Sequence, residues 1–192
     1  MVSDYYNQAN WNLADTMNIT IGQGANSYTL AQMTRYAMAL ANGGKLYPLS
    51  LVQEVKDENN ASSLYKPKAK GEQIKLNRPD SIHEVTKGMQ LAALAGGNDR
   101  CYKDFPVEVA IKTGTAERAG VNPYTGESYD SFSWQIGFAP YKDPEIAVAA
   151  VLFQGGSGMN CGPILRGVMA EYFGLNKQVV TETLPIENQL TP

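Results

Sequence analysis

One short stretch constrains the fold more than any other. Residues 146–153 read Ile-Ala-Val-Ala-Ala-Val-Leu-Phe and are apolar at every position. A strand with one face in water alternates apolar and polar residues, whereas a strand buried on both faces is apolar throughout. We therefore expect a strand over 145–154 that is covered on both faces and needs a neighbouring strand at each edge.

Two further segments, 107–111 and 131–139, are also rich in strand-forming residues. The turn at 141–144, Tyr-Lys-Asp-Pro, predicts that the second and third strands form a tight antiparallel hairpin. The segment 45–55 contains β-formers and could be the other neighbour of the third strand. With the polar residues that follow it, up to Gln73, it more simply predicts a small solvent-facing hairpin.

Helical spacing of apolar residues predicts three helices, whereas residues 1–24 lack a clear period and are predicted to be loop. The first helix begins at Thr29 and ends at Gly43-Gly44. The second begins with a capping box formed by Ser81 and Glu84 and ends at Gly96-Gly97. The third runs from Pro163 to Gly174. The residues expected to be buried are Leu30, Met33, Ala37, Leu40 and Ala41 in the first helix; Ile82, Val85, Met89, Ala92 and Ala93 in the second; and Ile164, Leu165, Val168, Met169, Tyr172 and Phe173 in the third.

These elements predict an α+β fold in which helices pack on an antiparallel sheet of three strands. We expect one folded region over 1–175 and a polar C-terminal tail over 176–192.

Composition excludes several classes of function. The chain has 192 residues, of which 43% are hydrophobic and 18% charged, as is usual for a soluble folded domain. Sixteen Lys and Arg against nineteen Asp and Glu give a net charge of -3 without a block of like charge. We therefore expect no nucleic-acid partner. The chain also lacks an apolar run long enough to cross a membrane.

Histidine and cysteine are too scarce for most metal and nucleophile schemes. His83 is the single histidine, and it lies off the predicted apolar stripe of its helix, so we expect it to be exposed. Cys101 and Cys161 lack zinc-site spacing, and we expect two separate thiols at opposite ends of the strand set. We expect neither a metal nor a cofactor.

The stretch Ile-Lys-Thr-Gly-Thr-Ala-Glu, at 111–117, is the candidate functional site. If it continues the strand at 107–111 along a sheet edge, alternation points Lys112 and Gly114 one way and Thr113 and Thr115 the other. Lys112 supplies a positive charge, the threonines supply hydroxyl donors, and Gly114 allows close approach of a ligand backbone. An edge strand could also bind an extended peptide. The alternative is a solvated lysine at the end of a strand.

Four stretches together resemble a known family: 15–24 (DTMNITIGQG), 39–44 (ALANGG), 111–117 (IKTGTAE) and 134–140 (WQIGFAP). They are similar in kind and order to the C-terminal half of the transpeptidase domain of class B penicillin-binding proteins. In that family K-T-G accompanies an S-x-x-K motif that carries the nucleophile.

The resemblance implies a D,D-transpeptidase at the extracytoplasmic face of the cell membrane. It would bind the D-Ala-D-Ala end of a peptidoglycan stem peptide and be acylated by β-lactams. It implies that Lys112 lies near the serine hydroxyls, that Thr113 and Thr115 hold the ligand carboxylate, and that the Thr115 N–H joins the oxyanion hole. Gly114 would keep the strand open to ligand. The three strands would be part of a larger five-stranded sheet, so the fold here would be incomplete.

The chain departs from the family pattern at the nucleophile. The S-x-x-K and S-x-N motifs of the family precede the I-G-Q-G stretch, and only eighteen residues precede Ile19. Ser63 and Lys66 do match S-x-x-K, but they lie in the polar hairpin, where a lysine stays solvated and protonated. We expect the serine on a segment outside this chain, and a partner or self-association to complete the sheet.

The sequence leaves two alternatives open. A β-lactamase or a β-lactam sensor would share the same motifs, and a non-catalytic binding or structural module would lack the serine altogether. Upstream DNA with an in-frame S-x-x-K segment and a membrane anchor would favour the transpeptidase, whereas an independent start would favour the module.

Overall fold

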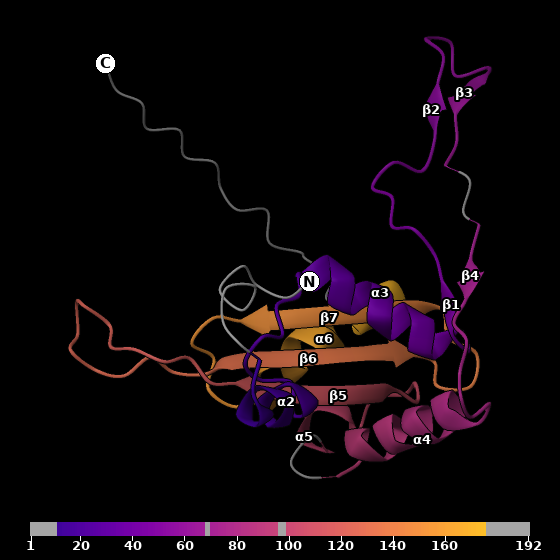
Figure 1. Cartoon of the computed structure of the whole chain (residues 1–192). Coiled ribbons are helices and arrows are strands. Elements are labelled where there is room, and N and C mark those ends of the chain that lie inside the picture. The colour runs from indigo at the N-terminus through magenta and orange to yellow at the C-terminus, as the bar shows by residue number, and fades with distance from the viewer. Residues whose placement is uncertain (1–10, 68–69, 96–98, 176–192) are drawn as a thin grey trace, which may run out of the picture.

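The centre of the protein is a three-stranded antiparallel sheet (Figure 1). The computed structural model describes residues 11–67, 70–95 and 99–175. The strands are β5 (Ala110–Ala116), β6 (Phe132–Ala139) and β7 (Ile146–Leu152), in the order β5-β6-β7. The predicted α+β fold is confirmed, while the predicted tail at 176–192 lies outside the described residues.

Strand β7 is covered on both faces, as its continuous apolar sequence predicted, but it ends at Leu152, and Phe153 of the predicted strand is 76% exposed. Val148 and Ala150 lie in a core cluster with Leu165 of helix α6 (Gly162–Tyr172). Ala147 and Ala149 instead pack against a second cluster, on the face covered by helix α3 (Leu30–Ala41). The sheet therefore lies between two helical layers (Figure 1).

The hairpin between β6 and β7 is also confirmed. The two strands pair antiparallel from Ser133 opposite Leu152 to Ala139 opposite Ile146, and Glu145 N donates to Ala139 O at 2.9 Å. Among the described residues β7 pairs with β6 alone. Its outer edge therefore has no strand neighbour within that part of the chain.

Helix α3 begins and ends as predicted. Thr29 is the N-cap and forms a capping box with Gln32, and Gly43 and Gly44 adopt positive φ angles of 76° and 93° after the helix. Such angles favour glycine, which has no Cβ to clash with the backbone.

Helix α4 (Ser81–Ala93) corrects the predicted capping box. The N-cap is Asp80 and no side chain caps the helix, so Ser81 is already helical and its hydroxyl cannot take the predicted role. Val85 is 47% exposed, which contradicts its predicted burial. Helix α4 packs against β5 through Met89 and Ala93, and its buried stripe is narrower than expected. The predicted stop at Gly96-Gly97 lies outside the described residues.

Other predicted apolar stripes are also narrower than expected. Leu30 in α3, and Ile164, Val168 and Tyr172 in α6, are each more than 40% exposed. Leu165 and Met169 are fully buried, so α6 packs on the sheet through one row of side chains.

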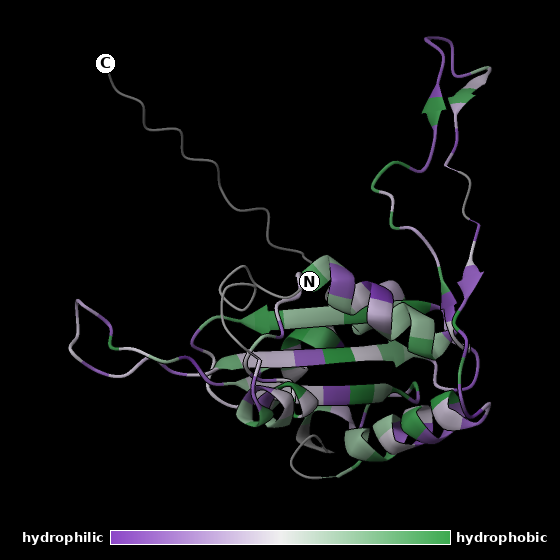
Figure 2. Ribbon diagram, in the orientation of Figure 1, coloured by the Kyte–Doolittle hydropathy of each residue, from purple (hydrophilic) through white to green (hydrophobic). Residues whose placement is uncertain are grey.

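Residues 45–67 and 70–73 belong to an arm that extends away from the sheet (Figure 1). At its base β1 (Lys45–Leu46) pairs with β4 (Glu72–Gln73), and further out β2 (Val55–Lys56) pairs with β3 (Ser63–Tyr65). The solvent-facing hairpin is confirmed, but the alternative that 45–55 joins β7 is wrong, because these strands pair only within the arm. Apolar residues of the arm, among them Leu51 and Leu64, are exposed. Figure 2 shows hydrophobic stretches, in green, along the arm.

Two short helices were not predicted. Helix α2 (Leu13–Thr20) replaces part of the loop expected over 1–24; it begins with a capping box in which Asn12 and Asp15 bond each other's backbone N–H. It buries no residue, so it has no apolar stripe from which a helix could be recognised. Helix α5 (Asp99–Tyr102) precedes β5 and contributes Tyr102 to the core.

Candidate active site

The K-T-G stretch lies on the outer strand of the sheet, as the sequence predicted. Strand β5 is the edge strand, and it pairs antiparallel with β6 alone. Lys112 is opposite Ile136, Thr113 opposite Gln135, Gly114 opposite Trp134 and Thr115 opposite Ser133.

Burial changes sharply along β5. Ala110 and Ile111 have no exposed surface, whereas Lys112 and Thr115 are exposed and Thr113 and Gly114 are half-buried. The strand therefore begins in the core and emerges at the K-T-G stretch. This places a lysine and two threonines on a rigid element with access to solvent, which suits a binding site.

The predicted alternation of side chains along β5 is confirmed. Ala110 belongs to the core on the α3 face, so Lys112 and Gly114, two and four residues later, share that face. Ile111 belongs to the core on the α6 face, and Thr113 and Thr115 share that one. The Lys112 ammonium donates to the Thr113 carbonyl at 2.6 Å, which holds the charge close to the strand.

A turn behind β5 contacts the site directly, and the sequence patterns did not predict it. The 3-10 helix η1 (Gly158–Cys161) follows β7, and the Gly158 N–H donates to the Thr115 hydroxyl oxygen at 2.9 Å. The run Gly155-Gly156-Ser157-Gly158 is a signal that could have marked a close backbone approach. Its target, forty-three residues away in sequence, could not be read from that run.

Buried polar side chains lie beneath the same face of the sheet. The Tyr102 hydroxyl donates to Gln135 Oε1 at 2.9 Å and lies 3.3 Å from Gly162 O, and the Cys161 thiol donates to Ser133 O at 3.1 Å. Burial raises the pKa of the Tyr102 hydroxyl well above its usual range, so it stays a neutral donor. Gln135 is fully buried, and its Nε2 has no hydrogen-bond partner in the described part of the chain.

The two cysteines are closer together than the sequence predicted. Both thiols are free, but they do not lie at opposite ends of the strand set. Helix α5 brings Cys101 against the start of α6, where a Cβ on Gly162 would be 2.7 Å from the Cys101 sulfur. Gly162 directly follows Cys161, so tertiary packing places Cys101 near Cys161, although the order of the strands in the sequence predicted that they would be far apart.

A family comparison decides what kind of domain this is. A model of the penicillin binding protein transpeptidase domain matches residues 2–170. The chain belongs to this family. The resemblance to class B penicillin-binding protein transpeptidases is thereby confirmed.

Individual relatives agree with the family match. The peptidoglycan D,D-transpeptidase MrdA of Salmonella typhimurium is 28% identical over 181 residues, which cover 85% of this chain and 28% of MrdA. Penicillin-binding protein A of M. tuberculosis, solved as an imipenem acyl-enzyme, has a TM-score of 0.69 and 25% identity over 81% of this chain and 33% of its own. A solved peptidoglycan synthase complex has a TM-score of 0.71 and 26% identity, covering 94% of this chain and 29% of the other. This chain thus spans about a third or less of the length of each.

The S-x-x-K match in this penicillin-binding protein domain does not have the surroundings that activate a serine nucleophile. Ser63 is in strand β3 of the arm, and both Ser63 and Lys66 are exposed. Residues three apart on an extended strand point to opposite faces, so the strand geometry does not direct the lysine at the serine. The arm gives neither the burial nor the contact that would activate a serine.

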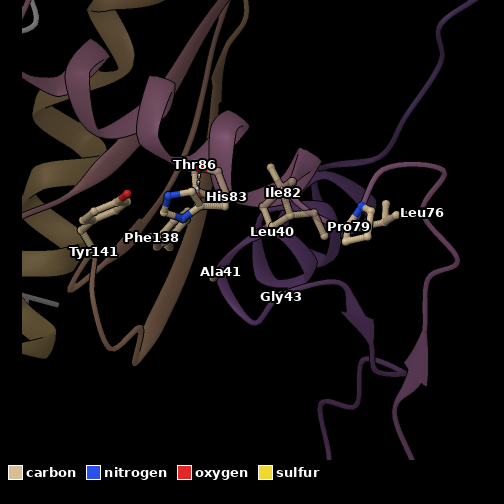
Figure 3. Close-up of a pocket in the computed structure, with 10 residues that line it drawn as sticks. All are labelled: Leu40, Ala41, Gly43, Leu76, Pro79, Ile82, His83, Thr86, Phe138 and Tyr141. Carbon is tan, nitrogen blue, oxygen red and sulfur yellow. Dashed lines mark hydrogen bonds between the residues drawn. The ribbon is translucent and has the colours of Figure 1, made fainter.

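A separate pocket of about 280 Å³ lies at the other end of the sheet (Figure 3). It is bounded by the C-terminal end of α3, the start of α4 and the β6–β7 turn, and His83, Thr86 and Tyr141 provide its polar groups. Phe138 in its wall is opposite Ala110, at the start of β5, whereas the K-T-G stretch lies further along that strand. His83 is exposed, as predicted, and is not at the K-T-G edge.

The described residues contain neither a metal-ligand cluster nor a helix that could span a membrane. No group of three or more His, Cys, Asp or Glu within 11–67, 70–95 and 99–175 could hold a metal ion. In the same ranges no helix is long and apolar enough to span a bilayer.

Proposed function

We propose that residues 112–115 form the wall of a D,D-transpeptidase site that binds the carboxylate of a peptidoglycan stem peptide ending in D-Ala-D-Ala. The observation that carries this proposal is the emergence of Lys112 and Thr115 into solvent on an edge strand whose earlier residues are buried. A positive charge and hydroxyl donors on a rigid strand suit a carboxylate, because charge-assisted hydrogen bonds are the strong ones.

Each residue has a separate role in this proposal. Lys112 lies near the serine hydroxyls and supplies positive charge. Thr113 and Thr115 hold the ligand carboxylate, and the Thr115 N–H supplies half of an oxyanion hole. Gly114 lets the peptide backbone approach, so an extended stem peptide could lie along the edge of β5.

β-Lactam antibiotics are the second class of ligand that we propose for this wall. The solved M. tuberculosis relative is an imipenem acyl-enzyme, which shows that a member of this family is acylated by such a drug. Penicillins also carry a carboxylate, so Thr113 and Thr115 would hold both kinds of ligand, with Lys112 supplying the positive charge.

The attacking serine, we propose, lies on a segment outside residues 1–192. The family match covers residues 2–170, which include the K-T-G stretch, and the one S-x-x-K match in the sequence, at Ser63, is exposed on the arm. On this account the chain alone is inactive in acyl transfer, because it lacks an activated nucleophile.

The outer edge of β7 is where the rest of the domain would attach. This strand is apolar on both faces, and within the described residues it pairs with β6 only. An unpaired edge of this kind favours pairing with another strand, either from the remaining part of the domain or from a second copy. The complete protein would act at the extracytoplasmic face of the bacterial membrane, where peptidoglycan stem peptides are cross-linked.

The test is the rate at which penicillin acylates the protein that joins this chain to the serine-bearing segment. We expect Lys112→Ala to slow acylation roughly 10- to 100-fold, since a charge-assisted hydrogen bond contributes about 1.5–3 kcal/mol. Lys142→Ala is the matched control, because Lys142 is also exposed but lies in the β6–β7 turn. An unchanged rate in Lys112→Ala would refute the assignment of this wall.

A further inference from the structure

Behind the K-T-G strand, the backbone of η1 lies so close to β5 that a side chain at Gly158 would clash with Gly114. A Cβ built on Gly158 would lie 2.4 Å from the Gly114 carbonyl oxygen and 2.9 Å from the Gly114 nitrogen. Gly158 does not have a positive φ, so its backbone conformation would accept another residue. The close approach to Gly114 is therefore what requires glycine here.

Gly158 also forms a hydrogen bond with the hydroxyl of Thr115, the residue that follows Gly114 in β5. Gly158 N–H donates to Thr115 Oγ1 at 2.9 Å, so one lone pair of this oxygen is occupied from behind. A threonine hydroxyl has one proton to donate and two lone pairs. With a backbone donor fixed on one side, the hydroxyl proton is directed away from Gly158, and the group is set to donate to an acceptor such as a carboxylate.

The turn that carries Gly158 is itself held by the sheet. Gly156 N donates to Ser131 O at 3.0 Å, and Asn160 Nδ2 donates to Gly155 O at 2.6 Å. At the other end of η1, the buried Cys161 thiol donates to Ser133 O. Ser131 directly precedes β6 and Ser133 is its second residue, opposite Thr115 in β5. The turn and Thr115 are therefore both held by the same end of the β5–β6 pair.

We propose that Gly158 is a positioning residue for Thr115: its N–H fixes the hydroxyl as a donor, and its missing side chain lets η1 set the position of the Gly114–Thr115 peptide. This inference rests on the proposed function of the K-T-G wall. It predicts that the wall favours a charged hydrogen-bond acceptor at this point. A carboxylate should therefore be preferred over its neutral ester, whose oxygens accept hydrogen bonds more weakly.

The first experiment is a double-mutant cycle in the protein that contains this chain and the serine-bearing segment. Acylation rates are measured with a penicillin and with its methyl ester for the wild type, Gly158→Ala, Thr115→Val and the double variant. We expect Gly158→Ala to slow acylation by the penicillin roughly tenfold or more, since small misplacements of reacting groups have large effects on rate. The ester should be affected less, and Gly158→Ala should add little to Thr115→Val.

Gly88→Ala is the matched control. Gly88 lies in α4, and a Cβ at this position would meet no atom within 4 Å beyond the backbone of its own helix, so alanine should be accepted without loss of rate. If Lys112→Ala leaves acylation unchanged, the proposed function fails. Two other results would overturn the positioning role while leaving the proposed function intact, provided that Lys112→Ala slows acylation. In the first, Gly158→Ala has no effect on acylation. In the second, the effects of Gly158→Ala and Thr115→Val are additive for both ligands.

A second measurement keeps the inference testable if Gly158→Ala does not fold. In the 192-residue chain, the NMR signal of the Gly158 amide is followed in Thr115→Val and Thr115→Ser. Loss of the acceptor in Thr115→Val should increase amide exchange at Gly158, and Thr115→Ser should restore the protection because serine keeps the hydroxyl. Equal exchange in the wild type and Thr115→Val would overturn the inference.

Discussion

Gly114 lies directly opposite Trp134 in the β5–β6 pair, and a Cβ on Gly114 would be 3.4 Å from the Trp134 Cβ. That distance is close to ordinary van der Waals contact, and Gly114 does not have a positive φ. Neither packing nor backbone conformation therefore requires glycine at this position. The proposed function supplies a reason for glycine here, because a ligand backbone would approach the edge of β5 at this residue.

Gly114→Ala should therefore separate function from stability. We expect the free energy of unfolding to change by less than about 1 kcal/mol, as for most mutations without a disruptive contact. Penicillin acylation in the protein with the serine-bearing segment should fall clearly, because the new methyl group occupies the ligand side. Urea denaturation and acylation kinetics measure the two effects.

Gly137→Ala provides the opposite control. A Cβ on Gly137 would be 2.7 Å from Ala110 O, so this substitution should be strongly destabilising. If Gly114→Ala behaves like Gly137→Ala in denaturation, or leaves acylation unchanged, Gly114 is not needed for ligand approach.

Tyr102→Phe should destabilise the protein, because it removes a hydrogen bond to the buried side-chain amide of Gln135, beneath the K-T-G strand. The substitution removes the hydroxyl that donates to Gln135 Oε1 and leaves that fully buried side chain without this partner. An unsatisfied buried polar group costs about 1–3 kcal/mol. Tyr124→Phe, at a side chain that is 95% exposed, should have no effect in the same urea titration.

The same tyrosine predicts how stability changes at alkaline pH. Burial raises the pKa of Tyr102 in the folded state above its ordinary value of 10.0, so the folded protein keeps a proton that the unfolded chain loses. This contribution to stability is complete below pH 10 and is lost as pH rises above it, by up to about 1.4 kcal/mol per pH unit. Tyr102→Phe should show a shallower loss of unfolding free energy above pH 10. Equal slopes in the two proteins would contradict the burial of this hydroxyl.

Asp57 predicts a local change in the arm at acid pH. Its carboxylate accepts hydrogen bonds from Ala61 N at 2.8 Å and Ser62 N at 3.1 Å, and these bonds lower its pKa below 3.8, with Ala61 the main cause. Stabilisation of the turn is therefore present above pH 3.8 and is lost as pH falls through the lowered pKa.

NMR titration of the arm should follow this change. The Asp57 carboxyl should titrate below pH 3.8, the Ala61 and Ser62 amides should shift with the same midpoint, and Asp57→Asn should abolish the shift. A midpoint at or above 3.8 would mean that the turn does not form as described.

Sequence patterns predicted the elements whose burial is visible locally. The apolar run of β7 and the capped, periodic helix after Thr29 both reflect packing that is encoded within a few residues. Helix α2 was not predicted because it buries no residue and so has no apolar stripe, although the capping box formed by Asn12 and Asp15 could have indicated it. The capping box expected at Ser81 does not form, because the helix begins one residue earlier than predicted, with Asp80 as its N-cap. The sequence pattern does not determine which polar residue becomes the N-cap.

The K-T-G edge could be predicted, but its support from behind could not. Lys112 to Thr115 are adjacent in sequence, so alternation along one strand was enough to assign their faces. The contacts of Thr115 with Gly158, and of Cys101 with Gly162, depend on how η1 and α5 pack beneath the sheet. Such long-range contacts leave no periodic signal in one sequence.

We propose above that this chain provides a binding wall without the nucleophile. A direct test incubates the folded 192-residue chain with a fluorescent penicillin and then examines it on a denaturing gel and by intact mass. The positive control is M. tuberculosis penicillin-binding protein A, which is known as a β-lactam acyl-enzyme. We predict a label on the control protein and no covalent adduct on this chain, since one wall cannot replace an activated serine. A stoichiometric, denaturation-resistant label on this chain, mapped to Ser63 or to any other serine within it, would contradict the account and identify a self-sufficient enzyme.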